Sequence, residues 1–164
     1  MAPVMSDYEQ IQNVVSLYCR CQDTRNWARM SQVFTPDAIC DYPSPPLARF
    51  ENLKDLGEQM GALLKDLKTL HNITSHYIEF TSDTTARSEA YTVAYHWGTG
   101  DTEGQCCVAT AIATDEFVKD VFDGKECWRI KFRKFVVPAP PVGDFGLLFP
   151  TGDTTMPKEF LVSQ

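Results

Sequence analysis

The sequence predicts a single α+β domain in which three N-terminal helices pack on a strongly curved, mostly antiparallel sheet. Three observations predict this fold. Residues 6–67 carry apolar side chains at helical spacing, residues 71–137 carry four runs rich in β-branched and aromatic residues, and a length of 164 residues fits one domain. Helices followed by an antiparallel meander give an α+β layout. A helix over a bent sheet leaves an apolar pocket inside a cone.

The three helices are predicted from capping and periodicity. Ser6 and Glu9 form a capping box that begins the first helix, and Asp23 stands at its end. The inward face of this helix carries Ile11, Val14, Val15, Tyr18 and Gln22. A short second helix is expected over residues 27–33 and is broken by residues 35–37. Apolar residues at helical spacing predict a third helix over residues 53–67.

The strands follow a proline-rich loop. A short strand is expected over residues 38–42, and Pro43, Pro45 and Pro46 then force a loop. Four longer strands are expected over residues 71–80, 86–97, 106–117 and 128–137, with turns at residues 98–101 and 123–124. Residues 1–137 should form the domain. The Pro-rich tail, residues 138–164, is either disordered or folded over the pocket mouth as a lid.

Composition excludes several classes of protein. A net charge of −7 disfavours nucleic acid as a partner, and no apolar run approaches the roughly 20 residues that span a bilayer. Residues 1–6 lack the basic and apolar regions of a secretory signal, so we expect an intracellular, cytoplasmic protein. The six cysteines should be reduced and mostly buried, and without a CxxC pair no metal site is expected. They are Cys19, Cys21, Cys40, Cys106, Cys107 and Cys127.

Four residues at the ends of predicted elements could carry chemistry. A carboxylate such as Asp23 is costly to bury unpaired, and a His–Asp pair is a general acid/base device. The candidates are Asp23, Tyr42, His71 and His96. Taken singly, each is equally explained by a structural role, as a solvated helix end, a core tyrosine or a satisfied histidine.

Two further sets of residues suggest no chemistry from sequence alone. His76 is expected on the face of its strand opposite to that of His71, because side chains alternate along a strand. Arg129, Lys131 and Arg133 alternate with apolar residues on the last strand, which predicts a wet face opposite a buried one.

Three segments resemble the SnoaL-like and nuclear transport factor 2-like superfamily. They are residues 11–27 (IQNVVSLYCRCQDTRNW), 33–38 (VFTPDA) and 69–73 (TLHNI). The resemblance covers residues 8–137 and implies an α+β cone with a deep apolar pocket. Within the superfamily the sequence is most similar to scytalone dehydratase-like fungal proteins. That similarity implies that Asp23, Tyr42, His71 and His96 are the catalytic residues.

The sequence also departs from that enzyme's pattern. Gln22 stands where the enzyme has a second tyrosine, and Ala111 and Ala113 stand where it has serine and asparagine. We therefore expect no pair of tyrosines holding a water molecule. The general base of the enzyme is retained in this sequence, while the groups that would activate the substrate carbonyl differ.

The resemblance implies a cofactor-independent dehydratase, isomerase or cyclase of fungal secondary metabolism. Its substrate would be a small apolar, oxygenated polyketide- or terpenoid-like molecule. His71, oriented by Asp23, would remove a proton, while Tyr42 and His96 stabilise charge or return the proton. Substrate contacts are expected from Tyr18, Gln22, Trp27, Tyr95, Trp97, Phe145 and Phe149.

Two other functions stay open. The fold also hosts non-catalytic ligand-binding and protein-adaptor modules. It hosts epoxide hydrolases as well, which use an Asp–Arg–Asp relay; Arg20 and Arg25 flank Asp23, but no second aspartate is evident on a matching strand. The family resemblance further implies a homo-oligomer, either a dimer or a trimer.

Overall fold

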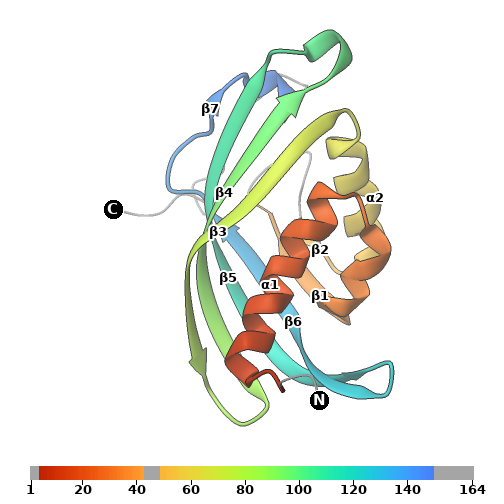
Figure 1. Cartoon of the computed structure of the whole chain (residues 1–164), viewed down its shortest axis with the longest axis vertical. Coiled ribbons are helices and arrows are strands. Elements are labelled where there is room, and N and C mark those ends of the chain that lie inside the picture. The colour runs from red at the N-terminus through yellow and green to blue at the C-terminus, as the bar shows by residue number, and fades with distance from the viewer. Residues whose placement is uncertain (1–3, 43–48, 150–164) are drawn as a thin grey trace.

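The computed structural model describes residues 4–42 and 49–149, which form helices on one face of a mixed sheet (Figure 1). This confirms the predicted α+β class. The helical elements are α1 (Asp7–Asp23), η1 (Trp27–Gln32), α2 (Leu53–Leu64), η2 (Gly100–Thr102) and η3 (Phe145–Leu147). The strands are β1 (Phe34–Asp41), β2 (Arg49–Phe50), β3 (Leu67–Phe80), β4 (Thr85–Gly98), β5 (Cys106–Phe122), β6 (Lys125–Val136) and β7 (Val142–Gly143). Within the described ranges, no helix is long and apolar enough to cross a membrane.

The strands form one open sheet in the order β2-β1-β6-β5-β4-β3, and β7 pairs with the part of β5 that β6 leaves unpaired. Neighbouring strands are antiparallel except β1 and β6, which run parallel. The sheet bends beneath the helices but curls less strongly than the cone that the sequence predicts (Figure 1).

Helix α1 begins and ends where the sequence predicts. The Ser6 backbone N–H donates to the Glu9 carboxylate at 2.7 Å, and the Glu9 N–H donates to the Ser6 hydroxyl at 3.3 Å, which completes the capping box. Ile11 and Val15 are fully buried on the inward face. The helix runs across the inner face of the sheet and brings Asp23 against the start of β3.

Two element boundaries differ from the prediction. Residues 35–37 belong to β1 rather than to a break, because the register of β1 against β6 shifts between Phe34 and Ile39 and tolerates Pro36, which lacks an N–H. The third predicted helix ends at Leu64, and Leu67 already begins β3. The predicted loop prolines 43, 45 and 46 lie outside the described residues.

Two β-bulges change which side chains face the helices. The register of β3 shifts between Ile73 and Ser75, so His76 pairs with the buried Ala90 and faces inward, on the same side as His71. A second shift, between Glu116 and Phe117 of β5, places Arg133 of β6 opposite the fully buried Asp115. The predicted wet face of the last strand is therefore wrong for Arg133.

Arg129 is also buried rather than solvated, for a different reason. Its guanidinium donates to the backbone carbonyl oxygens of Ser31 and Phe34 and to the carboxylate of Asp120. It thereby ties β6 to η1 and β1, and only 4% of it is exposed.

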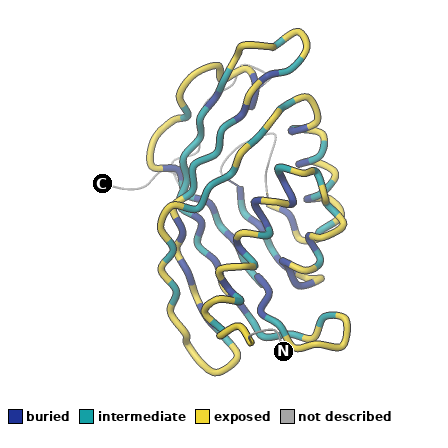
Figure 2. The backbone as a smooth tube through the Cα atoms, viewed as in Figure 1, coloured by how far each residue is buried: buried dark blue, intermediate teal, exposed yellow. Residues whose placement is uncertain are grey.

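The core lies between the helices and the inner face of the sheet (Figure 2). Its largest fully buried apolar side chains are Ile11, Phe34, Leu56, Leu64, Phe117, Trp128 and Ile130. Burying each contributes ~1.5–3 kcal/mol, so this layer supplies most of the stability. All six cysteines are free thiols, as predicted, and four of them are buried.

The tail returns along β5 after three prolines. The Asp144 carboxylate accepts from the Cys106 N–H at 2.8 Å, and the Asp144 N–H donates to the Cys106 carbonyl oxygen at 2.9 Å. Leu147, Leu148 and Phe149 are then buried near Cys107 and Ala109. The rest of the predicted tail, residues 150–164, lies outside the described residues, and the lid function stays a prediction.

Gly143 is the residue that lets β7 approach β5, and this gives a testable prediction. Its φ is +106°, and an added Cβ would lie 2.2 Å from the Cys106 carbonyl oxygen. We expect Gly143→Ala to cost about 1–3 kcal/mol and to detach the tail. The measurement is amide hydrogen exchange at Asp144 and Leu148, with Gly146→Ala as the control because a Cβ there meets nothing within 4 Å. Equal protection of these amides in the two variants would contradict the prediction that Gly143→Ala detaches the tail.

Candidate active site

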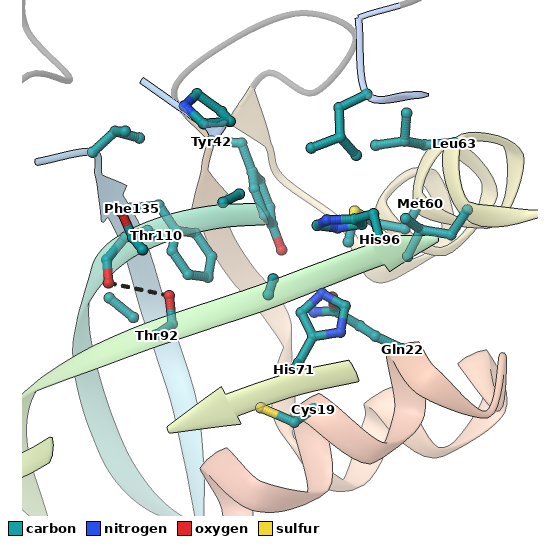
Figure 3. Close-up of a pocket in the computed structure, with 18 of the residues that line it drawn as sticks. Cys19, Gln22, Tyr42, Met60, Leu63, His71, Thr92, His96, Thr110 and Phe135 are labelled. Atoms are coloured by element: carbon teal, nitrogen blue, oxygen red, sulfur yellow. Dashed lines mark hydrogen bonds between the residues drawn. The ribbon is translucent and has the colours of Figure 1, made fainter. Parts of the chain in front are cut away.

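A cavity of about 170 Å³ lies between α1, α2, the inner face of the sheet and the tail. Its wall is mostly apolar and includes Met60, Leu63, Ile73, Ala94, Ala109 and Ala111. Two sets of polar side chains interrupt this wall. The histidine group comprises His71 and His96, and the phenol–guanidinium group comprises Tyr18, Tyr42 and Arg133. Figure 3 shows His71, His96 and Tyr42 converging from different strands.

The end of α1 and the start of β3 form a His–Asp pair. The His71 Nδ1 lies 2.6 Å from Asp23 Oδ1, and the His71 backbone N–H donates to Asp23 Oδ2 at 3.1 Å. An ionised carboxylate only accepts, so Nδ1 carries a proton, and in the neutral ring Nε2 is the nitrogen with the lone pair. Since His71 lines the cavity while Asp23 lies behind it, the ring presents a base to any ligand there.

The surroundings keep Asp23 ionised. Burial raises the pKa of this carboxyl, but hydrogen bonds from the His71 ring, the His71 backbone and the Thr69 hydroxyl outweigh it. The net effect is a pKa below the usual value, so Asp23 is a carboxylate at neutral pH.

His96 is neutral and presents an acceptor to the cavity. Only 5% of the residue is exposed, and its Nδ1–H donates to the Cys107 carbonyl oxygen at 3.3 Å, which leaves Nε2 as an acceptor. Burial, and then the neighbouring His71, lower its pKa to about 4. The two rings meet edge to face at 5.7 Å. His96 therefore offers Nε2 as a hydrogen-bond acceptor, and its catalytic role stays a prediction.

Two tyrosines meet in the cavity despite the presence of Gln22. The hydroxyl oxygens of Tyr18 and Tyr42 lie 2.5 Å apart. Tyr18 precedes Gln22 by about one helical turn and faces the same side of α1, so it supplies the second phenol that Gln22 does not. One phenol donates to the other, which leaves one O–H for a ligand. Burial raises the pKa of Tyr18 to about 12 and that of Tyr42 well above 10, so both stay protonated.

Arg133 adds a buried cation beside these phenols. Its Nε and Nη2 donate to the two oxygens of Asp115 at 2.6 and 2.7 Å, and its guanidinium carbon lies 4.1 Å from the centre of the Tyr18 ring. Burial opposes the charge, but Asp115 outweighs it and raises the pKa of Arg133. The third nitrogen, Nη1, has no hydrogen-bond partner among the described residues. This nitrogen is buried, so it is other atoms of Arg133 that line the cavity.

Sequence reasoning missed Arg133 as a site residue because the bulge that turns it inward is set by strand pairing. The only signal was an arginine and an aspartate on adjacent predicted strands, whose register the sequence does not give. It also missed the partnership of the two tyrosines, although the helical spacing of Tyr18 and Gln22 could have indicated it.

Some of the expected substrate contacts line the cavity and others do not. Gln22 and Phe149 line it, as do Tyr18 and the small residues Ala111 and Ala113.

Four of the expected contacts lie elsewhere. Trp27 packs on α2 against Gly57 and Gly61. Tyr95 and Trp97 stack on each other at 5.5 Å on the outer face of β4, because the alternation that turns His96 inward turns both of them outward. Phe145 is 38% exposed on the tail and does not reach the cavity.

The profile of the SnoaL-like domain matches residues 3–134 of the chain. The chain belongs to the SnoaL-like domain family. This agrees with the sequence resemblance and with the observed helices and sheet. No curated protein matches the sequence.

Several solved structures share the fold. A protein of Novosphingobium aromaticivorans to which aromatic ring hydroxylase activity has been ascribed is 19% identical, with 87% of this chain and 96% of that chain covered and a TM-score of 0.73. A second protein of that organism, to which scytalone dehydratase activity has been ascribed, is 19% identical (84% and 87% covered, TM-score 0.70). The hexachlorocyclohexane dehydrochlorinase LinA-type3 of Novosphingobium barchaimii is 16% identical (85% and 90% covered, TM-score 0.67).

The neutrality of His96 predicts a pH dependence of stability. Because its pKa in the fold lies near 4 rather than 6.5, the unfolded chain binds more protons between these values, and stability falls as pH falls through that window. The loss should reach about 3 kcal/mol. Urea unfolding at pH 7 and pH 4.5 measures it, and His96→Gln should show a smaller loss. An imidazole NMR signal of His96 that titrates between pH 6 and 7 would contradict this.

Proposed function

We propose that this SnoaL-like protein is a cofactor-independent acid/base enzyme acting on a small apolar, oxygenated molecule. It removes a proton from the carbon next to a carbonyl group. The observation that carries this proposal is that a carboxylate-held imidazole, His71, lines the same cavity as the phenols of Tyr18 and Tyr42, which lie beside the buried guanidinium of Arg133. A base opposite hydrogen-bond donors is the arrangement that enolate formation requires.

The proposed reaction proceeds in two steps. His71 Nε2 takes the proton from the carbon, and the electron pair of the broken C–H bond moves to the carbonyl oxygen. That oxygen accepts from the available phenol O–H, and the buried positive charge of Arg133 lies beside the Tyr18 ring. When the enolate collapses, a hydroxyl group on the next carbon leaves with the proton held by His71, and the product is water and an alkene.

Dehydration is the favoured outcome among related ones. If the proton of His71 returns to another carbon, the same site isomerises a double bond, and if an internal nucleophile attacks, it closes a ring. Two structural neighbours bear names that describe eliminations, a dehydratase and a dehydrochlorinase, and this supports a lyase. The apolar wall supports a polyketide- or terpenoid-like substrate of secondary metabolism.

The charge of the cavity favours an uncharged substrate. Asp115 neutralises Arg133, and Asp23 lies behind His71 rather than in the wall. No net positive charge is thus available for a carboxylate or phosphate. The six free thiols support a reducing, intracellular location for this chemistry.

The other functions find less support. A pure adaptor has no use for a buried His–Asp pair, and among the described residues Arg133 hydrogen-bonds to one carboxylate, Asp115, rather than to the two of an epoxide hydrolase relay.

We also propose a homo-oligomer, dimer or trimer, through the outer face of the sheet, where Leu70, Tyr77, Tyr91 and Trp97 are exposed. Residues 138–149 would serve as the lid.

Deuterium exchange into 2-tetralone, a ketone with acidic protons next to its carbonyl, tests the proposal without knowledge of the natural substrate. NMR in D₂O measures the exchange, which we expect the wild-type protein to catalyse. The exchange rate of His71→Gln should be about 10²–10⁴-fold lower because the base is gone. The exchange rate of Asp23→Asn should fall by a comparable factor. His76→Gln is the matched control, because His76 lies on the same face of β3 but does not line the cavity. Equal rates in the His71 and His76 variants would refute the assignment.

A further inference from the structure

A chain of hydrogen bonds lies behind the His–Asp pair, outside the cavity, and begins at Arg25. This residue follows α1 with a left-handed backbone, φ +57°. Its Nη2 donates to the carbonyl oxygens of Leu64 at 2.7 Å and Leu67 at 2.5 Å, and its Nη1 donates to the carbonyl oxygen of Gln22 and to the Thr69 hydroxyl at 3.0 Å. Arg25 thus joins the ends of both long helices to the start of β3, and none of these bonds goes to a carboxylate.

The Thr69 hydroxyl accepts one hydrogen bond of this chain and donates the next. A guanidinium can only donate, so the Thr69 oxygen accepts from Arg25 and its single proton must point elsewhere. It points to Asp23 Oδ1, at 2.9 Å. Asp23 therefore accepts three hydrogen bonds, two from His71 and one from Thr69. Neither Arg25 nor Thr69 lines the cavity, so neither would touch a substrate.

We propose that Arg25 and Thr69 are positioning residues that hold the Asp23 carboxylate in its ionised, fixed orientation and so keep the proton of His71 on Nδ1. The proposal rests on the proposed function in taking Asp23 and His71 as the acid/base pair. It goes beyond that function in giving a task to two residues that touch no ligand.

A purely structural role for Arg25 is the alternative, since its bonds to helix-end carbonyl oxygens would stabilise the fold by themselves. A structural role would change stability but not the titration of Asp23. Among the described residues, the other ionisable side chains that line the cavity beside His71 are Tyr18 and Cys19 on α1, Tyr42 after β1, His96 on β4 and Arg133 on β6. Helix α2 and strand β5 contribute only uncharged side chains to the cavity wall.

The variants Thr69→Val and Thr69→Ser decide between these roles. Valine matches the shape of threonine but removes the donor, so the pKa of Asp23 should rise as the ionised form loses a hydrogen bond. Serine keeps the hydroxyl and should leave the pKa of Asp23 near the wild-type value. Carbon-13 NMR of the side-chain carboxyl measures this, and nitrogen-15 shifts of the His71 ring report its tautomer. If Asp23 titrates alike in the wild type and both variants, the proposal is overturned.

Arg25→Gln tests the first link of the chain. It should raise the pKa of Asp23 in the wild-type background and raise it much less when Thr69 is already valine, because the effect passes through the hydroxyl. Additive shifts would show that Arg25 acts by charge alone and would overturn its positioning role. If Arg25→Gln does not fold, the Thr69 pair still decides. None of these readouts requires turnover, so a wild-type protein inactive on 2-tetralone would refute the proposed function and leave this test intact.

Discussion

The carboxylate of Asp23 fastens the end of α1 to the start of β3, and the cavity is organised around that contact. Because α1 crosses the inner face of the sheet and is fixed at this end, its inward residues project into one enclosed space. Tyr18 and Gln22 line that space, and Asp23 stands just behind it. The same helix therefore supplies a phenol donor and the partner of the base. A small rotation of α1 would displace both together.

The two polar groups of the cavity differ in hydrogen-bonding role: one offers acceptors and the other offers donors. In the neutral rings of the histidine group each Nε2 is the acceptor, because Nδ1 donates to Asp23 in His71 and to the Cys107 carbonyl oxygen in His96. The phenol–guanidinium group offers hydrogen-bond donors, whose high pKa values keep them protonated. Burial is what separates the two sets, because it suppresses the imidazolium form of His96 and the phenolate form of Tyr18 alike. An apolar wall between such groups suits a substrate whose charge appears only during reaction.

The sequence predicted the features that local signals determine. The capping box and helical spacing gave α1 and the position of Asp23, and strand alternation places His96 inward once the chain register is known. The same alternation, applied consistently, would have turned Tyr95 and Trp97 outward. The resemblance to a known family, rather than residue chemistry, brought Asp23, Tyr42, His71 and His96 together as a candidate site.

The features that the sequence did not predict depend on pairing between distant strands. The two bulges that turn His76 and Arg133 inward exist only relative to β4 and β5, so no local pattern records them. The hydrogen bonds of Arg25 likewise join segments some 40 residues apart in sequence.

The cavity should stabilise negative charge on a ligand oxygen, and this can be measured with 4-nitrophenol. Its ionisation can be followed by absorbance while it is bound, and its ring is small enough for a cavity of about 170 Å³. The bound phenol should ionise at a lower pH than in water, and the double variant Tyr18→Phe, Tyr42→Phe should lose this shift, because either tyrosine alone still offers one O–H. Ionisation of the bound phenol at a higher pH than in water would show that burial outweighs the donors, and would contradict the account.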